Sequence, residues 1–160
     1  MSAGAPSTAE QFAAWVRPHL PAMSRLAARF APDADRDDVV QEAMTRAWTK
    51  RRQFDPDRGA ASAWLLAITA DQAAKARRRS GRTLAALPDV PPPTDPDANL
   101  DIERALAHLS ERQRQAVDCL YFVGLTVPET AAVMGCAEGT VKSTLADARA
   151  KLRTLLEVAS

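Results

Sequence analysis

Apolar residues recur at intervals of three and four along much of the chain, the spacing that places side chains on one face of a helix. The clearest case follows Asp35, where an apolar stripe runs from Val40 to Trp48. Asp35 can accept hydrogen bonds from the first amides of this helix, and the acidic residues after it face the positive end of the helix dipole. Further helices are predicted over residues 12–16, 23–30 and 61–79.

The C-terminal third of the chain carries stronger signals for the start and end of helices. Ser110–Gln113 and Thr126–Glu129 each have the sequence of a capping box, in which the first and fourth residues satisfy each other's backbone amides. The second box opens a short helix that stops at Gly135, and a long helix follows from about Gly139 to Glu157. A short helix, a tight turn and a second helix form the helix-turn-helix arrangement, which can place its second helix in a DNA major groove.

A proline-rich segment, residues 84–99, separates these two halves. Five of the eleven prolines of the chain lie between Pro88 and Pro96. Proline cannot donate a backbone hydrogen bond, so we expect a flexible, solvated linker that could reach about 50 Å at roughly 3.1 Å per residue. The sequence therefore predicts an all-α protein of two small helical domains, residues 1–83 and 100–160, with few contacts between them.

Composition and charge narrow the class of function. Hydrophobic residues make up 46% of the chain but aromatic residues only 5%, which suits closely packed helices built from Ala, Leu and Val. Residues 1–84 hold fourteen Lys and Arg against nine Asp and Glu, the charge excess expected of a surface that faces phosphates. No apolar run is long enough to span a bilayer and no signal peptide is visible, so we expect a cytoplasmic protein without membrane insertion.

The chain offers no arrangement typical of an enzyme. His19 and His108 fall in different halves, and no Ser, Cys or Asp stands beside either as a catalytic partner. Cys119 and Cys136 lack metal-ligand spacing, and the acidic residues ahead of Val39 fit helix capping better than a calcium loop. We therefore predict no catalytic residue, no metal and no cofactor.

Two stretches in the first half resemble a known family. The run from Asp38 to Glu42, followed by Arg46-Ala-Trp48, resembles the polymerase-binding helix of bacterial sigma factors. This resemblance implies that Asp38, Gln41 and Glu42 dock on a coiled coil of the largest subunit of core RNA polymerase. Phe54–Gly59 and the helix after it are similar to the part of the family that captures a flipped base and lines the melted strand. The residues implied for the minus-ten DNA are Phe54, Arg58, Ser62, Trp64, Lys75, Arg77, Arg78 and Arg79.

The second half resembles the domain that reads the minus-thirty-five element in extracytoplasmic-function sigma factors. The resemblance is carried by the sequences that start at Leu109, Tyr121 and Glu138. It implies promoter DNA and an anti-sigma factor as partners, and these residues as DNA contacts: Thr140, Lys142, Ser143, Thr144 and Arg149. Thr144 and Asp147 stand where the family is usually basic, so we expect this domain to bind DNA weakly when isolated.

Two other function classes are open at this point. The second half also resembles the output domains of response regulators, which are helix-turn-helix regulators of transcription. Their receiver domains alternate strands with helices, whereas the first half of this chain shows no strand pattern. An adaptor that only binds proteins is the other alternative. In that case its DNA-facing surfaces would be idle. Apart from the choice of function class, Trp64 is expected more often in a core than as a base-stacking platform, and the basic run from Lys75 to Arg79 has the alternative of a solvated helix end.

Overall fold

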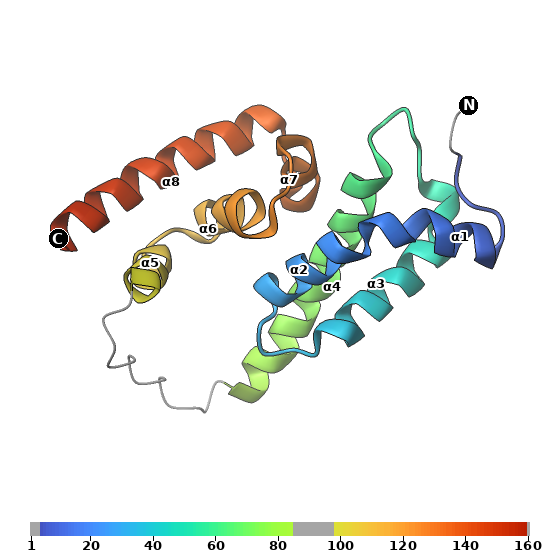
Figure 1. Ribbon diagram of the computed structural model, residues 1–160, viewed down its shortest axis with the longest axis horizontal. Helices are drawn as coiled ribbons and strands as arrows, with labels where there is room; N and C mark the ends of the chain where they lie inside the picture. The colour runs from blue at the N-terminus through green and yellow to red at the C-terminus, as the bar shows by residue number, and fades with distance from the viewer. Residues whose placement is uncertain (1–3, 85–97, 160) are drawn as a thin grey trace.

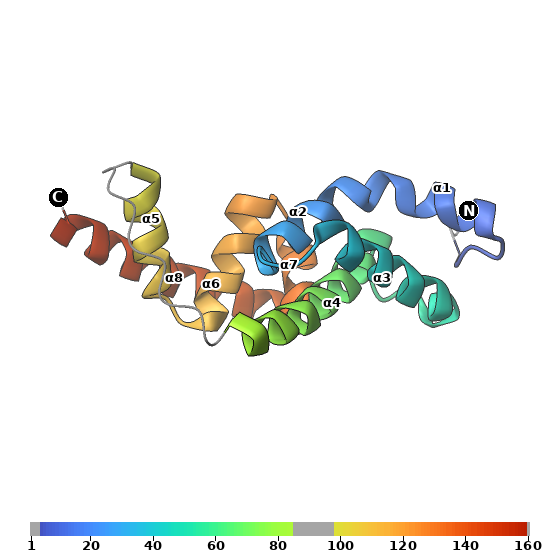
Figure 2. The same cartoon turned by 90° about the horizontal axis from the view of Figure 1, so that it is seen from below.

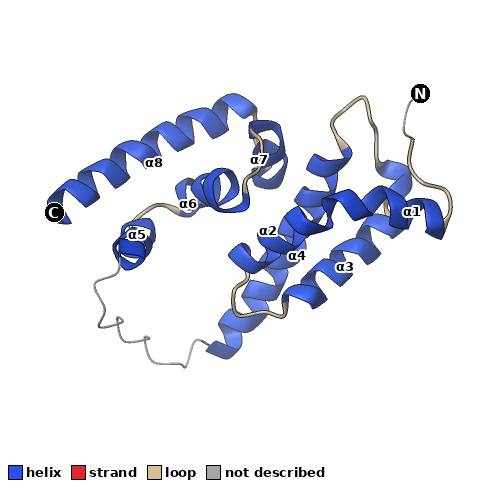
Figure 3. Cartoon of the chain, viewed as in Figure 1, coloured by secondary structure: helices blue, strands red, loops and turns tan. Residues whose placement is uncertain are grey.

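The computed structural model describes residues 4–84 and 98–159, and every regular element within these ranges is a helix (Figures 1 and 3). The first lobe, residues 4–84, contains α1 (Ala9–Val16), η1 (Arg17–His19), α2 (Leu20–Phe30), α3 (Arg36–Thr49), η2 (Arg51–Gln53) and α4 (Ala61–Leu84). The second lobe, residues 98–159, contains α5 (Ala98–Ala107), α6 (Glu111–Val117), the π-helix η3 (Asp118–Val123), α7 (Val127–Met134) and α8 (Glu138–Ala159). The all-α prediction is confirmed.

The first lobe is a bundle in which α4 packs against both α2 and α3. Large aliphatic side chains fill its centre, and those with no exposed surface are Met23, Leu26, Leu65 and Leu66. Ala43, Ala47 and Ala73 are also fully buried, and their small side chains let the helix backbones approach closely. The predicted stripe of α3 is therefore a core face from Val40 to Ala47, and the half-buried Trp48 at its end packs on Phe12.

The helix caps of the first lobe agree with the sequence, but two helix starts do not. The Asp35 carboxylate accepts hydrogen bonds from the amides of Asp37 at 2.9 Å and Asp38 at 3.3 Å, as predicted. However, α1 begins at Ala9 behind a Thr8 cap, and α2 begins at Leu20 with Pro21 in its first turn. Proline is tolerated in the first turn because the amide it lacks would have no helical partner there, so Pro21 marks a start and not a break.

Both predicted capping boxes are present in the second lobe. The Ser110 and Gln113 side chains each accept from the other's backbone amide, at 3.1 and 3.0 Å, and Thr126 and Glu129 do the same at 3.2 and 2.9 Å. Between the boxes, α6 continues into η3 and ends at Gly124, where φ is +81°. Only glycine adopts this left-handed conformation at little cost, which explains the sharp entry into the helix-turn-helix.

The two lobes lie against one another, contrary to the expectation of few contacts. Helix α7 packs along α4, and η3 packs against α2 (Figures 1 and 2). Cys119, Val123 and Leu125 of the second lobe are buried in the same cluster as the core of the first lobe. A proline-rich spacer sets how far apart two lobes can move, but their apolar surfaces decide whether they associate. Residues 85–97, which include most of the predicted linker, lie outside the described residues.

Within the described ranges, no helix combines the length and the apolar character needed to cross a membrane.

Candidate nucleic-acid interface

The polar face of α3 is open to solvent. Asp38, Gln41 and Glu42 are all exposed, whereas Val39 and Val40 between them are buried. The Glu42 carboxylate lies 3.3 Å from the Arg46 guanidinium, one turn further along the same face. The sequence-based prediction that Gln41 and Glu42 lie on an exposed helix face is confirmed.

The loop between η2 and α4 is anchored by aromatic rings. Phe54 is only 9% exposed, and its ring lies 5.3 Å from that of Trp15 and 5.5 Å from that of Trp64. These tilted contacts are the arrangement that aromatic rings favour, and they hold the start of the loop against the bundle. Beyond this anchor the loop turns outward, and the Arg58 side chain is 90% exposed.

The anchored loop forms one wall of a cleft. A cavity of about 330 Å³ is lined by Phe54, Arg58 and Trp64 together with Ala67, and Ala132 of α7 closes its other side. The structure therefore brings together the predicted minus-ten residues of the loop and of the first turn of α4. It gives Phe54 and Trp64 a packing role as well, which agrees with the reading of Trp64 as a core residue.

The basic run on α4 lies further along the helix. Arg77 is 13 residues beyond Trp64, a distance of about 20 Å along a helix axis. Lys75 pairs with Asp71 at 3.4 Å, while Arg77 points to the second lobe and pairs with Glu111 at 3.2 Å. Lys75, Arg78 and Arg79 stand at the i, i+3 and i+4 positions of one helix face, whereas Arg77 is turned to the second lobe.

Helix α8 presents its first turns to solvent. Thr140, Lys142 and Ser143 are exposed and Thr144 is half-buried. On the opposite face, the buried residues of α8 are Val141, Leu145 and Ala148, with Leu152 partly buried beside them. The predicted inward face of this helix is confirmed, and the candidate DNA-contacting residues stand on the other side.

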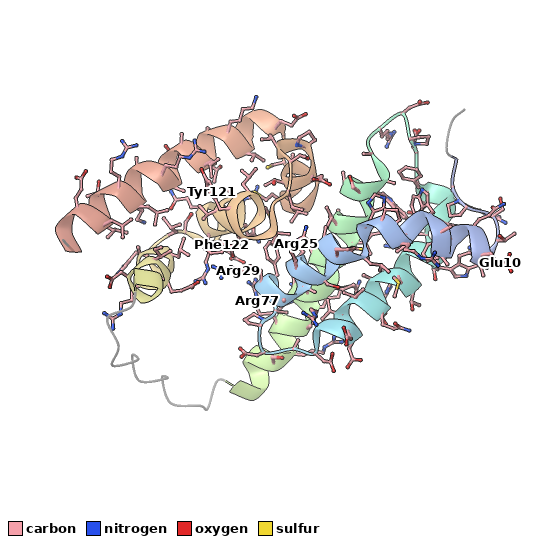
Figure 4. All side chains as sticks on the ribbon, viewed as in Figure 1. Glu10, Arg25, Arg29, Arg77, Tyr121 and Phe122 are labelled. Carbon is pink, nitrogen blue, oxygen red and sulfur yellow. The ribbon has the colours of Figure 1, made fainter. Side chains whose placement is uncertain are left out.

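The last candidate, Arg149, has a partner that the sequence did not predict. Its guanidinium donates from Nε to the Tyr121 hydroxyl at 2.7 Å, and Nη2 donates to the same oxygen. Figure 4 shows Tyr121 on the second lobe. Arg149 lies about 10 Å beyond Lys142 along the helix, given seven residues at 1.5 Å each. Tyr121 thus fixes where this cation stands relative to the first turns of α8.

A partly buried ion pair joins the lobes, and the sequence did not predict it. Arg29 of α2 donates from Nε to the Asp118 carboxylate at 2.9 Å and from Nη1 to Glu103 at 3.0 Å. Arg114 lies 3.8 Å from the other Asp118 oxygen, and the Arg29 guanidinium covers the ring of Phe122 at 3.9 Å. Burial raises the pKa of the Asp118 carboxyl above its usual value, while the pairing with Arg29 and Arg114 acts in the opposite direction.

One sequence signal could have pointed to this pair. Asp118 directly follows Val117 and precedes Cys119 in an apolar stretch, and a carboxylate in such a place needs a cationic partner. No sequence pattern indicates which cation pairs with Asp118, because Arg29 lies 89 residues away in the other lobe.

Each lobe matches a model of a known protein family. Residues 15–83 match the family model described as Sigma-70 region 2, and residues 99–152 match that described as Sigma-70, region 4. These ranges cover the first lobe from the end of α1 onward and most of the second.

Two similar proteins match this chain over most of its length. The chain is 38% identical over 139 residues to the ECF RNA polymerase sigma factor SigM of Mycobacterium tuberculosis, covering 84% of this chain and 69% of SigM. It is 35% identical over 150 residues to SigL of the same organism, covering 87% of this chain and 85% of SigL.

Solved structures of similar shape include CnrH in complex with the cytosolic domain of CnrY, with a TM-score of 0.69 and 31% identity over 98% of this chain and 94% of CnrH. They also include the sigma factor RpoE in complex with the anti-sigma factor NepR from Bartonella quintana, with a TM-score of 0.64 and 28% identity over 94% and 99%. The chain belongs to the extracytoplasmic-function family of RNA polymerase sigma factors, which are transcription initiation factors.

Proposed function

We propose that this sigma factor uses three surfaces of the described structure. The exposed face of α3, with Asp38, Gln41 and Glu42, binds core RNA polymerase. The loop from Phe54 to Gly59 and the adjoining face of α4 bind the melted minus-ten strand, and the first turns of α8 meet the minus-thirty-five duplex. The chain performs no catalysis itself and acts where polymerase acts, in the cytoplasm.

The observation that carries this proposal is the separation of buried and exposed residues on α3. The helix packs into the bundle through Val39, Val40, Ala43 and Ala47, so its acidic face contributes nothing to the core. An exposed row of acceptors on a rigid helix is suited to binding a basic partner surface.

The second lobe supports the duplex-binding part. Helix α8 is held by Val141, Leu145 and Ala148, which leaves Thr140, Lys142 and Ser143 facing outward at its N-terminal end. The N-terminal residues of the second helix are those that meet base edges in a helix-turn-helix.

An anti-sigma factor is a further proposed partner. RpoE of Bartonella quintana, which covers 94% of this chain, was solved with the anti-sigma factor NepR. We propose that a protein inhibitor of this kind also binds the present chain.

Run-off transcription with core polymerase tests the proposal. Templates come from transcript starts mapped after overexpression of the chain. Transcripts should require both core polymerase and the chain, and the double substitution Gln41→Ala and Glu42→Ala should reduce them strongly. A matched control is Glu10→Ala and Gln11→Ala, which removes the same two side-chain types from an exposed part of α1. An ordinary helix-turn-helix regulator would instead bind the duplex tightly without polymerase and produce no transcript with core polymerase alone.

A further inference from the structure

The second lobe carries an arginine whose hydrogen-bond partner is a neutral group. Arg149 of α8 donates from Nε and from Nη2 to the Tyr121 hydroxyl of η3, and its guanidinium carbon lies 5.6 Å from the centre of the Tyr121 ring. By contrast, Arg29, Arg46 and Arg77 are held by carboxylates, which offset their charge. No carboxylate pairs with Arg149 in the described part of the chain, so Tyr121 orients this cation without neutralising it.

The bonds to Tyr121 leave one edge of the guanidinium open. A guanidinium has five N–H groups, and the Tyr121 oxygen takes up those on the edge formed by Nε and Nη2. The edge formed by Nη1 and Nη2 therefore keeps a donor on each nitrogen, and the Arg149 side chain is exposed. Two parallel N–H donors on a planar group match the two oxygens of a phosphate, which arginine binds through both at once.

Tyr121 stands in the π-helical turn η3, on the side of α8. The next residue, Phe122, lies under the Arg29 guanidinium of the first lobe at 3.9 Å, whereas Tyr121 points to α8 (Figure 4). Tyr121 is 55% exposed, so packing in the core does not account for a large aromatic residue at this position. Turns of this type occur often at functional sites.

The pair also lies on the side of α8 to which the duplex is assigned. Arg149 follows Lys142 by seven residues, which is two helical turns to within about 20°, so both residues stand on one side of the helix, about 10 Å apart. The major groove of DNA is about 12 Å wide. With Lys142 at the base edges, Arg149 would reach the phosphates that border the groove, and contacts to these phosphates fix the orientation of a protein on the duplex.

We propose that Tyr121 is a positioning residue for DNA binding: its hydroxyl holds the Arg149 guanidinium so that the open Nη1–Nη2 edge binds one phosphate of the minus-thirty-five duplex. Because the side chain is already oriented in the free chain, less of its freedom is lost when the phosphate binds. This inference rests on the proposed binding of the minus-thirty-five duplex by α8, and it adds to that surface a residue that precedes the helix-turn-helix.

Three single variants test the proposal. Tyr121→Phe removes the hydroxyl and keeps the ring, and Arg149→Met removes the cation. The matched control is Lys151→Met, which removes the same charge from an exposed residue of α8 two positions further on, about 200° around the helix. Circular dichroism checks that each variant keeps its helices. Each full chain is assembled with core polymerase and titrated with a labelled promoter duplex taken from the mapped transcript starts.

The two members of the pair should differ in their response to salt. Tyr121→Phe should lower the affinity for the duplex about fivefold, since an unoriented arginine must be ordered on binding, and it should leave the salt slope unchanged because no charge is removed. Arg149→Met should lower the affinity further and reduce the salt slope by about one. In the Arg149→Met chain, Tyr121→Phe should have no further effect, because no guanidinium is left to orient.

Duplexes with a single uncharged methylphosphonate identify the phosphate. At one position of the minus-thirty-five element, Tyr121→Phe and Arg149→Met should cause no further loss of affinity, whereas Lys151→Met should act there as it does on the unmodified duplex. Wild-type affinity of Tyr121→Phe would overturn the proposal, and so would a loss that is equal at every methylphosphonate position.

Tyr121→Phe could instead weaken assembly with core polymerase and leave duplex affinity unchanged. That result would overturn the proposal too, because Arg149 would then bind a polymerase carboxylate. The proposed function is tested separately by the wild-type chain. If its complex with polymerase neither binds the duplex nor yields a run-off transcript, the function itself is refuted, whatever the variants do.

Discussion

Removing the charge of Asp118 should weaken the association of the lobes and with it the stability of the first lobe. Asp118→Asn keeps the shape of the side chain but removes half of the ion pair with Arg29, whose Nε lies 2.9 Å from the carboxylate. The Asp118 side chain is only 8% exposed and that of Arg29 21%. The substitution therefore leaves a guanidinium that water reaches poorly.

The expected loss of unfolding free energy depends on the partners that Arg29 retains after the substitution. Removing one partner of a fully buried ion pair typically costs about 3–5 kcal/mol, since the other charge is left uncompensated. Arg29 retains Glu103 at 3.0 Å, a carboxylate whose side chain is 45% exposed. Burial of Asp118 disfavours its charge, and the raised pKa indicates that at this carboxyl burial outweighs the pairing, so the loss comes from the guanidinium of Arg29 that is left without its partner. We therefore expect a loss of about 1–2 kcal/mol, near the value of a hydrogen bond to a charged group.

A double-mutant cycle with urea denaturation isolates this energy. Arg29→Met retains the aliphatic part of the side chain, so the four proteins of the cycle with Asp118→Asn give the coupling energy of the pair. The control cycle uses Lys75→Met and Asp71→Asn, an exposed pair one helical turn apart at 3.4 Å. That pair should couple by about 0.3–0.5 kcal/mol only.

Tryptophan fluorescence, used to follow unfolding in this cycle, also tests whether the two lobes are in contact in solution. Trp15, Trp48 and Trp64 all lie in the first lobe, whereas Asp118 lies in the second. If the lobes are held together in solution, Asp118→Asn should lower the midpoint of the fluorescence transition. Lobes that unfold independently would leave that midpoint unchanged. An unchanged midpoint, or a coupling energy no larger than that of the control pair, would refute the reasoning.

Three further predictions concern single surfaces. Gln41→Ala with Glu42→Ala should weaken binding to core polymerase by about 1–2 kcal/mol in an anisotropy titration, with the circular dichroism spectrum unchanged, and equal affinity would remove the α3 assignment. Lys142→Ala should lower promoter affinity of the polymerase complex by about 1–3 kcal/mol if it reads a base. If it meets only phosphate, every sequence should lose equally and the salt slope should fall by about one. Burial raises the pKa of the Cys119 thiol to about 12, so iodoacetamide at pH 8 should label Cys136 and spare Cys119 in the folded chain, as read by mass spectrometry.

Features set by neighbouring residues were predictable from the sequence. The Asp35 cap, both capping boxes and the inward face of α8 depend on residues within four positions of one another, and the structure has all of them. The start of α2 was misplaced because Pro21 fits both a break and a first turn, and in the structure it lies in the first turn. The domain boundaries themselves stay a prediction.

Features set by distant residues were not predictable. The exposure of Gln41 and Glu42 follows from helical periodicity. The hydrogen bond from Arg149 to the Tyr121 hydroxyl, in contrast, joins residues 28 positions apart, so no local pattern predicts it. The packing of α7 on α4 depends on how apolar residues such as Val123 and Leu125 divide between two surfaces. Their hydrophobicity indicates that they are buried but does not indicate which surface they pack against.

The tether between the lobes makes a single ion pair matter for how the lobes are placed. Two modules joined by a short tether meet at an effective concentration on the order of millimolar. An interface with a dissociation constant of about 1 mM, or roughly 4 kcal/mol, would then be half closed. At this balance a pair worth about 1.4 kcal/mol changes the ratio of closed to open chains tenfold. Arg29 and Asp118 pair across the two lobes and are thus placed to shift the ratio of associated to separated lobes.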